Sequence, residues 1–170
     1  MSTKAVQLVV AYDGTDFGGW QRQKNARSVQ EELEKALQTI HGHPVKLTGA
    51  GRTDAGVHAL GQVAGFFSDI PTIPIERFKV ALNSLLPKDI RVMSASPAPG
   101  DFHARFDASL RRYRYFVLCG SRQDPFRNRY AWCISRQPAL AKLNAMAEVL
   151  VGEHDFSAFA SAGDSSLSRS

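Results

Sequence analysis

Residues 4–12 read KAVQLVVAY, a mostly apolar run that predicts a β-strand. Residues 28–31 read SVQE, which is a capping box, because a serine and a glutamate three residues later can satisfy the first amides of a helix. Apolar residues then recur at helical spacing as far as Ile40, and Gly42 and Pro44 mark the end of the helix. This stretch therefore predicts a strand followed by an amphipathic helix.

The chain then continues to alternate between strands and helices. Three further short strands are predicted, over residues 45–48, 61–67 and 90–95. Pro71 and Pro74 open a second helix that runs to about Leu85. We expect its apolar face to carry Phe78, Leu82 and Leu85. The order β-α-β-β-α-β predicts a ferredoxin-like or RRM-like α+β unit, with a mainly antiparallel sheet, two helices on one face and the other face open for a ligand.

The rest of the chain extends this unit by a further strand and helix. Residues 1–100 are expected to form one domain and residues 101–170 to begin a second portion of the molecule. A strand is predicted over 110–118, because cationic and aromatic side chains alternate there. A helix is predicted over 138–151, because leucines recur at helical spacing, and residues 157–170 are rich in serine and alanine, as expected of a connecting loop.

The composition is that of an ordinary globular protein. Of 170 residues, 44% are hydrophobic and 22% are charged. No stretch approaches the roughly 18 continuous apolar residues that a membrane-spanning helix needs, and the N-terminus does not have the pattern of a secretory signal. Only two cysteines are present, Cys119 and Cys133, so we expect a reducing, cytoplasmic setting.

The charge points to an anionic partner. The formal net charge is +5 and the sequence pI is about 9.5. Excess lysine and arginine favour polyanions, because each neutralised phosphate releases counterions. The cations concentrate in residues 103–129, at Arg105, Arg111, Arg112, Arg114, Arg122, Arg127 and Arg129. Charge alone is equally consistent with a solvated face.

The densest functional cluster is residues 49–58, GAGRTDAGVH, in a predicted loop between two strands. A guanidinium at Arg52 would hold the carboxylate of Asp54 ionised, as a nucleophile or general base requires. A polar turn with a surface ion pair would explain the same residues. The glycines match neither of the phosphate-binding patterns GxGxxG and GxxxxGK[ST]. The five histidines lack the spacing of metal ligands, so we predict no metal site.

Three other segments carry side chains suited to RNA. In the loop over residues 13–23, Trp20, Gln21 and Arg22 could stack on a base and bond its edge, although Trp20 could equally anchor a packed loop. Tyr113 offers a stacking ring among cations, unless it is a core residue of the strand. Residues 101–106, DFHARF, could contact phosphates or form a solvated connection.

Taken together, the motifs resemble those of one family, the TruA-type tRNA pseudouridine synthases, over essentially the whole chain. They occur in the family's order: YDG (12–14), GWQRQ (19–23), SVQ (28–30), GRTDAGVH (51–58), DFHARF (101–106) and RYRY (112–115). The resemblance implies isomerisation of uridine to pseudouridine in the anticodon arm of tRNA, at positions 38 to 40. It implies no cofactor and no metal, and a homodimer with tRNA lying across both subunits.

The resemblance also assigns roles to residues. Asp54 matches the catalytic aspartate, which attacks the sugar or promotes glycal formation, so that the uracil can rotate and rejoin through carbon. Arg52 matches the arginine linked to flipping the target nucleotide, and Tyr113 the tyrosine that stacks on the base. The remaining candidates for RNA contact are Trp20, Gln21, Arg22, His58, His103, Arg105, Arg111, Arg112 and Arg114.

Family members are normally longer, with a second α/β half that supplies further pocket residues. We therefore expect this chain to be truncated, to have little or no isomerase activity on its own, and to be prone to self-association. Two other classes of function fit less well. An RRM-like RNA-binding module would share the sheet topology, but no RNP-type run is present. A hydrolase using Asp54 and His58 would lack a nucleophile elbow.

Overall fold

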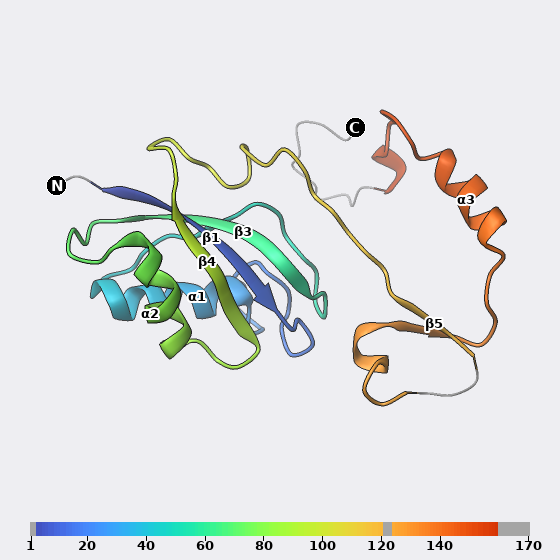
Figure 1. Ribbon diagram of the computed structural model, residues 1–170, viewed down its shortest axis with the longest axis horizontal. Coiled ribbons are helices and arrows are strands. Elements are labelled where there is room, and N and C mark those ends of the chain that lie inside the picture. The colour runs from blue at the N-terminus through green and yellow to red at the C-terminus, as the bar shows by residue number, and fades with distance from the viewer. Residues whose placement is uncertain (1–2, 121–123, 160–170) are drawn as a thin grey trace. The chain divides into compact units, whose positions relative to one another are not determined.

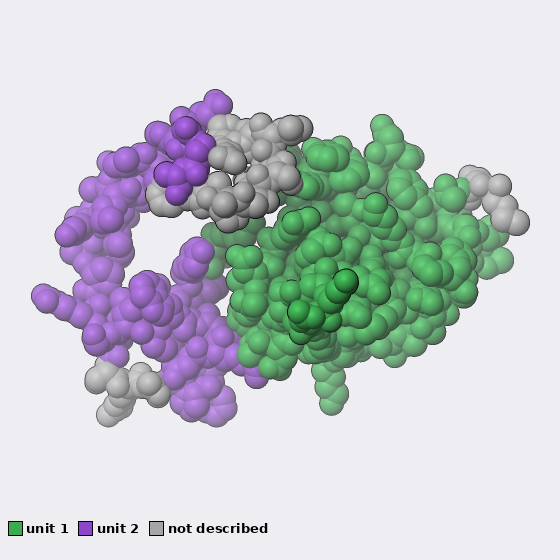
Figure 2. All heavy atoms as spheres, turned by 180° about the vertical axis from the view of Figure 1, so that it is seen from behind, with its two compact units in different colours: residues 1–114 green, residues 115–170 purple. Residues whose placement is uncertain are grey.

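The structure is a computed structural model that describes residues 3–120 and 124–159. It divides into two compact units, residues 1–114 (unit 1) and residues 115–170 (unit 2), which Figure 2 colours separately. The basic segment over residues 103–129 is divided between the two units, and Arg127 and Arg129 lie in unit 2. Arg122 lies outside the described residues, as does the part of the chain from residue 160 onward.

Unit 1 contains a four-stranded sheet with the order β2-β3-β1-β4, in which every neighbouring pair is antiparallel. Its elements are β1 (Lys4–Tyr12), α1 (Val29–His41), β2 (Thr48–Gly49), β3 (Ala59–Ser68), a 3₁₀ turn (Ile75–Arg77), α2 (Phe78–Leu85) and β4 (Ile90–Pro97). Both helices lie on the same side of the sheet (Figure 1). This arrangement confirms the predicted ferredoxin-like α+β fold, although β2 is shorter and later than the strand predicted over 45–48.

Helix α1 begins and ends where the sequence places its caps. The Ser28 side chain accepts a hydrogen bond from the Glu31 amide at 3.4 Å. At the other end, Gly42 adopts the left-handed conformation with φ of 76°, and its amide donates to the Gln38 carbonyl at 2.8 Å. Both ends of the helix are therefore satisfied by local hydrogen bonds.

The core of unit 1 lies between the sheet and the two helices. The alternating residues of β1 and the apolar faces of α1 and α2 supply its fully buried side chains, among them Val6, Leu8, Val10, Leu33, Leu37, Phe78 and Leu82. The expectation that Leu85 joins this face is wrong, because its side chain is 47% exposed. Leu86, four residues after Leu82, is buried instead, as helical spacing of four requires.

Unit 2 contains two short parallel strands, β5 (Val117–Cys119) and β6 (Trp132–Ile134), and the helix α3 (Leu140–Glu148). It also has 3₁₀ turns at Asn128–Tyr130 and Ser157–Phe159. The strand predicted over 110–118 is wrong in extent, because β5 begins only at Val117, although the Phe116 carbonyl accepts a hydrogen bond from the Trp132 amide of β6 at 2.7 Å. The apolar face predicted for the helix is exposed, and no residue among 115–120 and 124–158 is buried.

Across residues 3–120 and 124–159, none of the helices combines the length and the apolar character needed to cross a membrane.

Candidate active site

The loop of residues 49–58 joins β2 to β3, and its first part is held by β3. The Ala50 amide donates to the Val63 carbonyl at 2.8 Å. The Gln62 side-chain amide donates to the Gly51 carbonyl at 2.7 Å. These two bonds fix the backbone immediately before Arg52.

A second loop, residues 13–20 after β1, bonds to the rest of the loop of residues 49–58, which is the candidate catalytic loop. The Trp20 amide donates to the Thr53 carbonyl at 2.9 Å, and the Gly56 amide donates to the Phe17 carbonyl at 3.2 Å. The approach is close because residue 19 is glycine: its φ is +106°, and a β-carbon there would lie 2.5 Å from the Thr53 carbonyl oxygen. Hydrogen bonds thus hold the backbone on both sides of residue 54.

The aromatic side chains of Tyr12 and Trp20 pack beneath the loop. The Tyr12 hydroxyl lies 2.9 Å from the Thr53 hydroxyl, and the centroids of the Tyr12 and Trp20 rings are 6.0 Å apart. Burial raises the pKa of the Tyr12 phenol, although hydrogen bonds from Thr53 and Gln62 act in the opposite direction. The sequence motifs included Tyr12 and Thr53 but gave neither a role, and Gln62 was missed, because the contacts of these residues join distant parts of the chain and form no local pattern.

Trp20 is only 2% exposed, and its ring occupies the space that a β-carbon on Gly49 would need. A ring in this position cannot stack on an RNA base, so the prediction that Trp20 contacts RNA does not fit the structure. The alternative, an anchor that holds a packed loop, describes its position. Gln21, the next residue, is exposed.

Asp54 and Arg52 project from this fixed backbone. Both side chains are exposed, and neither has a hydrogen-bond or ion-pair partner among the residues that the structure describes. The surface ion pair considered for these two residues is therefore not formed. A carboxylate on a rigid backbone, left open to solvent, is suited to attack an electrophilic carbon of a substrate, because little ordering is needed when the substrate arrives.

Tyr113 lies beside the start of the loop. Its hydroxyl oxygen is 3.9 Å from the position that a β-carbon on Gly51 would occupy, and the side chain is 62% exposed. It belongs to no strand, so the alternative of a core strand residue does not apply. The structure thus brings Tyr113 and the loop of Asp54 together, although they are far apart in the sequence.

Arg111 also reaches the loop. Its Nε and Nη2 donate to the Ala50 carbonyl at 3.1 Å and 2.9 Å, and Nη2 donates to the Arg105 carbonyl at 2.9 Å. Its neighbours Arg112 and Arg114 are exposed and have no partner among the described residues. The three arginines, which were all predicted to contact RNA, therefore have different surroundings.

Two histidines predicted as RNA contacts are engaged within unit 1. His58 is half-buried, and its Nδ1 lies 3.1 Å from both the Gly14 amide nitrogen and the Asp13 carboxylate. The ring of His103 stacks on that of Phe106 with centroids 4.2 Å apart. The Arg105 guanidinium lies 5.9 Å from the same Phe106 ring, so a cation and an exposed aromatic ring meet at this point.

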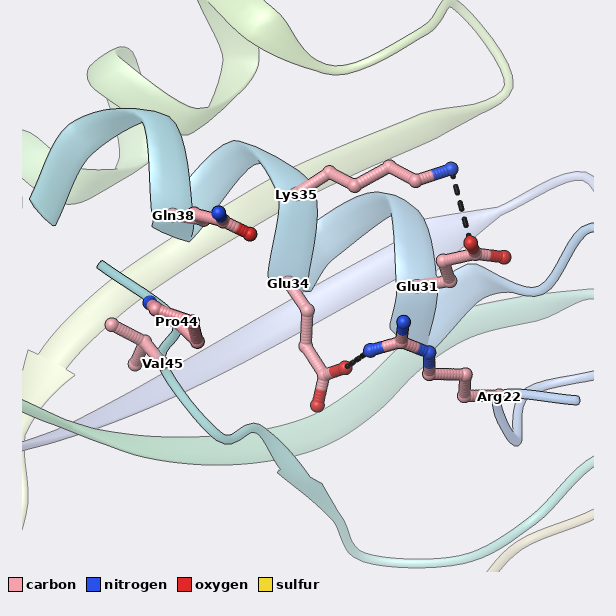
Figure 3. A pocket seen from close by; sticks show the side chains of 7 residues that line it. All are labelled: Arg22, Glu31, Glu34, Lys35, Gln38, Pro44 and Val45. Atoms are coloured by element: carbon pink, nitrogen blue, oxygen red, sulfur yellow. Dashed lines mark hydrogen bonds and ion pairs between the residues drawn. The ribbon is translucent and has the colours of Figure 1, made fainter. Parts of the chain in front are cut away.

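Arg22 lies away from this loop, beside a pocket on α1. Its Nη1 is 3.5 Å from the Glu34 carboxylate, as Figure 3 shows. The pocket is lined by charged and amide side chains of α1 together with Pro44 and Val45. Nothing in this pocket adds to the carboxylate site. Within the described ranges, no three histidine, cysteine, aspartate or glutamate side chains come together as metal ligands would.

The chain is similar to known proteins of one family. The sequence profile of the tRNA pseudouridine synthase family matches residues 8–107. The tRNA pseudouridine synthase A of Treponema denticola is 49% identical over 172 aligned residues, which cover 98% of this chain and 64% of the relative. The proteins of the same name from Brachyspira hyodysenteriae and Thermoanaerobacter sp. are 45% and 47% identical, and each match covers 96% of this chain and 66% of the relative.

The chain thus spans slightly less than two thirds of the length of these curated relatives. The profile match covers more than half of the chain, and it includes the loop of Arg52 and Asp54 together with the segment that carries His103 and Arg105. The chain belongs to the tRNA pseudouridine synthase family.

Proposed function

We propose that the protein isomerises uridine to pseudouridine in tRNA, with Asp54 as the catalytic nucleophile. The observation that carries this proposal is the exposed, unpartnered carboxylate on a loop whose backbone is bonded on both sides of residue 54. The names of the similar proteins support the reaction and the substrate class. The anticodon arm, at positions 38 to 40, is the proposed target.

The reaction needs few chemical groups. The bond between N1 of uracil and C1′ of the ribose breaks, the detached uracil rotates, and a bond forms between its C5 and C1′. The hydrogen on C5 is then lost and N1 gains one, so that the product is an isomer of the substrate. The Asp54 carboxylate attacks C1′, as in retaining glycosidases, or promotes formation of a glycal. No redox step is involved.

Arg52 and Tyr113 are proposed to present the base. Removing a nucleotide from its stack costs a few kcal/mol. The Arg52 guanidinium, two residues before Asp54, is proposed to fill the gap and contact phosphates, and its exposure supports this role. The ring of Tyr113 can stack on the extruded base, which contributes roughly 1–3 kcal/mol. The exposed cations Arg105, Arg112 and Arg114 are proposed to contact the phosphate backbone of the RNA.

The larger assembly is part of the same proposal. Residues 101–170 would begin the second half of the synthase, and two subunits would bind one tRNA between them in the cytoplasm. The described part of unit 2 exposes large apolar side chains such as Trp132 and Leu140, which is consistent with further protein packing against it.

The test is to incubate tRNA with the protein that includes the second half present in the longer relatives, because residues 1–170 alone are expected to have little or no isomerase activity. Pseudouridine is then mapped by chemical modification and primer extension. We expect pseudouridine in the anticodon arm with the wild type, and a loss of more than about 1000-fold with Asp54→Asn. The matched control is Glu76→Gln, which neutralises an exposed carboxylate on the 3₁₀ turn before α2 and should leave the rate unchanged.

The competing function is a non-catalytic RNA-binding module of RRM-like architecture, which the sheet topology alone would allow. Such a protein would bind tRNA and form no pseudouridine, and Asp54→Asn would leave its affinity unchanged. Pseudouridine formation by Asp54→Asn at the wild-type rate would instead remove Asp54 from the mechanism.

A further inference from the structure

The Arg111 guanidinium lies against backbone at the base of the catalytic loop. It donates to the carbonyls of Ala50 and Arg105, with three N···O distances between 2.9 and 3.1 Å. Its Nε is also 3.6 Å from the position of a β-carbon on Gly51, so the side chain runs over that glycine. A planar guanidinium with fixed N–H directions is suited to joining two carbonyls in this way.

These bonds complete the attachment of the loop. β3 holds the Ala50 amide and the Gly51 carbonyl, but it leaves the Ala50 carbonyl without a strand partner. Ala50 is buried, so losing a donor there would leave a polar group poorly satisfied. Arg111 supplies that donor. Its bond to the Arg105 carbonyl also restrains the segment that carries Arg111 itself and Tyr113, which is two residues after Arg111.

We propose that Arg111 is a positioning residue that holds the catalytic loop and Tyr113 in a fixed relation, and that its main role is not to neutralise RNA phosphate. The proposal rests on the proposed function for the roles of Asp54 and Tyr113. It departs from the expectation that Arg111, like Arg112 and Arg114, contacts RNA. Two of its guanidinium nitrogens are already bonded to backbone, whereas those of Arg112 and Arg114 are not bonded to any described residue.

The decisive variant is Arg111→Lys in the intact protein, because it keeps the charge and removes the planar fork. The matched control is Arg77→Lys, which makes the same replacement at an exposed arginine on the 3₁₀ turn before α2, outside the proposed site. Each variant is measured for amide hydrogen exchange in the loop, for the single-turnover rate at saturating tRNA, and for tRNA affinity as a function of salt. Thermal unfolding shows whether each variant is folded.

For Arg111→Lys we expect the amides of Trp20, Gly56 and Val57, which bond within or onto the loop, to exchange about 10-fold faster. We expect the single-turnover rate to fall about 10- to 100-fold, because the nucleophile and the stacking ring lose their alignment. The affinity for tRNA and its salt dependence should stay within about two-fold of wild type. Arg77→Lys should change none of these quantities.

Two results would overturn the proposal. One is wild-type loop exchange and wild-type rate in a folded Arg111→Lys. The other is an Arg111→Ala variant that turns over at the wild-type rate while its salt slope drops by about 0.7–0.9, as the loss of one phosphate contact requires. If the wild type itself forms no pseudouridine, the proposed function fails, and the hydrogen-exchange comparison still decides whether Arg111 positions the loop.

Discussion

Unit 1 and unit 2 contain similar amphipathic patterns but differ in what those patterns bury. In unit 1, leucines of α1 such as Leu33 are fully buried against the sheet. In unit 2, the leucines of α3 are exposed, and Leu143 is the least exposed of them at 44%. The helices also differ at their starts, since Ser28 caps α1 with its side chain, whereas Ala139 provides α3 with no side-chain cap.

This difference shows that periodicity records which face of a helix can be buried, and that a second layer decides whether it is. Helical stability in proteins comes mainly from packing of the apolar face. Unit 1 supplies that layer from its own sheet, and the described part of unit 2 does not. The two units should therefore respond differently to the same substitution.

The largest expected effect is on the core of unit 1. Leu33→Ala should lower the free energy of unfolding by about 2–5 kcal/mol, because it leaves a cavity in a packed core. Leu143→Ala removes the same atoms from an exposed site and should cost less than about 0.5 kcal/mol. Urea denaturation followed by circular dichroism measures both. Equal losses for the two variants would mean that α3 is packed as tightly as α1.

A smaller effect is expected where two loops of unit 1 meet. Gly19→Ala forces a side chain into a left-handed conformation and toward the Thr53 carbonyl, and we expect a loss of about 1–3 kcal/mol. Gly100→Ala is the control, since nothing lies within 4 Å of its added carbon. The same denaturation measurement applies. A neutral Gly19→Ala would show that the grip on the catalytic loop can relax.

The smallest effect depends on pH and concerns the pair His43 and Asp69, whose Nε2 and Oδ2 are 2.9 Å apart. The Pro44 carbonyl and then Asp69 raise the pKa of His43, and the hydrogen bond from His43 lowers the pKa of Asp69. The histidine stabilises the fold below its unfolded pKa of about 6.5 and ceases to do so as the pH rises through its folded pKa. The aspartate stabilises the fold above about pH 3.9 and ceases to do so in acid.

The pair should therefore contribute most between about pH 4 and pH 6.5. We expect His43→Gln to lower Tm by about 1 °C at pH 5.5 and to have no effect at pH 9, because an exposed pair contributes little. The control is His154→Gln, in which an exposed histidine of unit 2 is replaced. A Tm difference of the same size at both pH values would show that the ion pair of His43 and Asp69 is not the cause of the loss.

Much of unit 1 could be predicted because its signals are local. The apolar run of β1 and the caps at Ser28 and Gly42 act over a few residues, and the structure confirms them. The extended strand predicted over 110–118 failed because alternating side chains do not by themselves provide a neighbouring strand. β6, only three residues long, has no periodicity from which to predict it.

The candidate site divides in the same way. The cluster around Arg52 and Asp54 could be found because its residues are consecutive in the chain. The contacts of Arg111 with Ala50 and of Tyr12 with Thr53 could not, because they join residues 61 and 41 positions apart. The burial of Trp20 was left open for a similar reason, since its neighbour Gly49 belongs to another element.

The two tryptophans of the chain give each unit its own optical reporter. Trp20 is 2% exposed in unit 1, and Trp132 is 69% exposed in unit 2, so their fluorescence should differ in wavelength and in access to a quencher such as iodide. Replacing Trp132 with phenylalanine would leave only Trp20, whose indole lies against Gly49 and whose backbone amide donates to the Thr53 carbonyl. Its emission would then report, without any attached dye, how the catalytic loop responds when RNA is added.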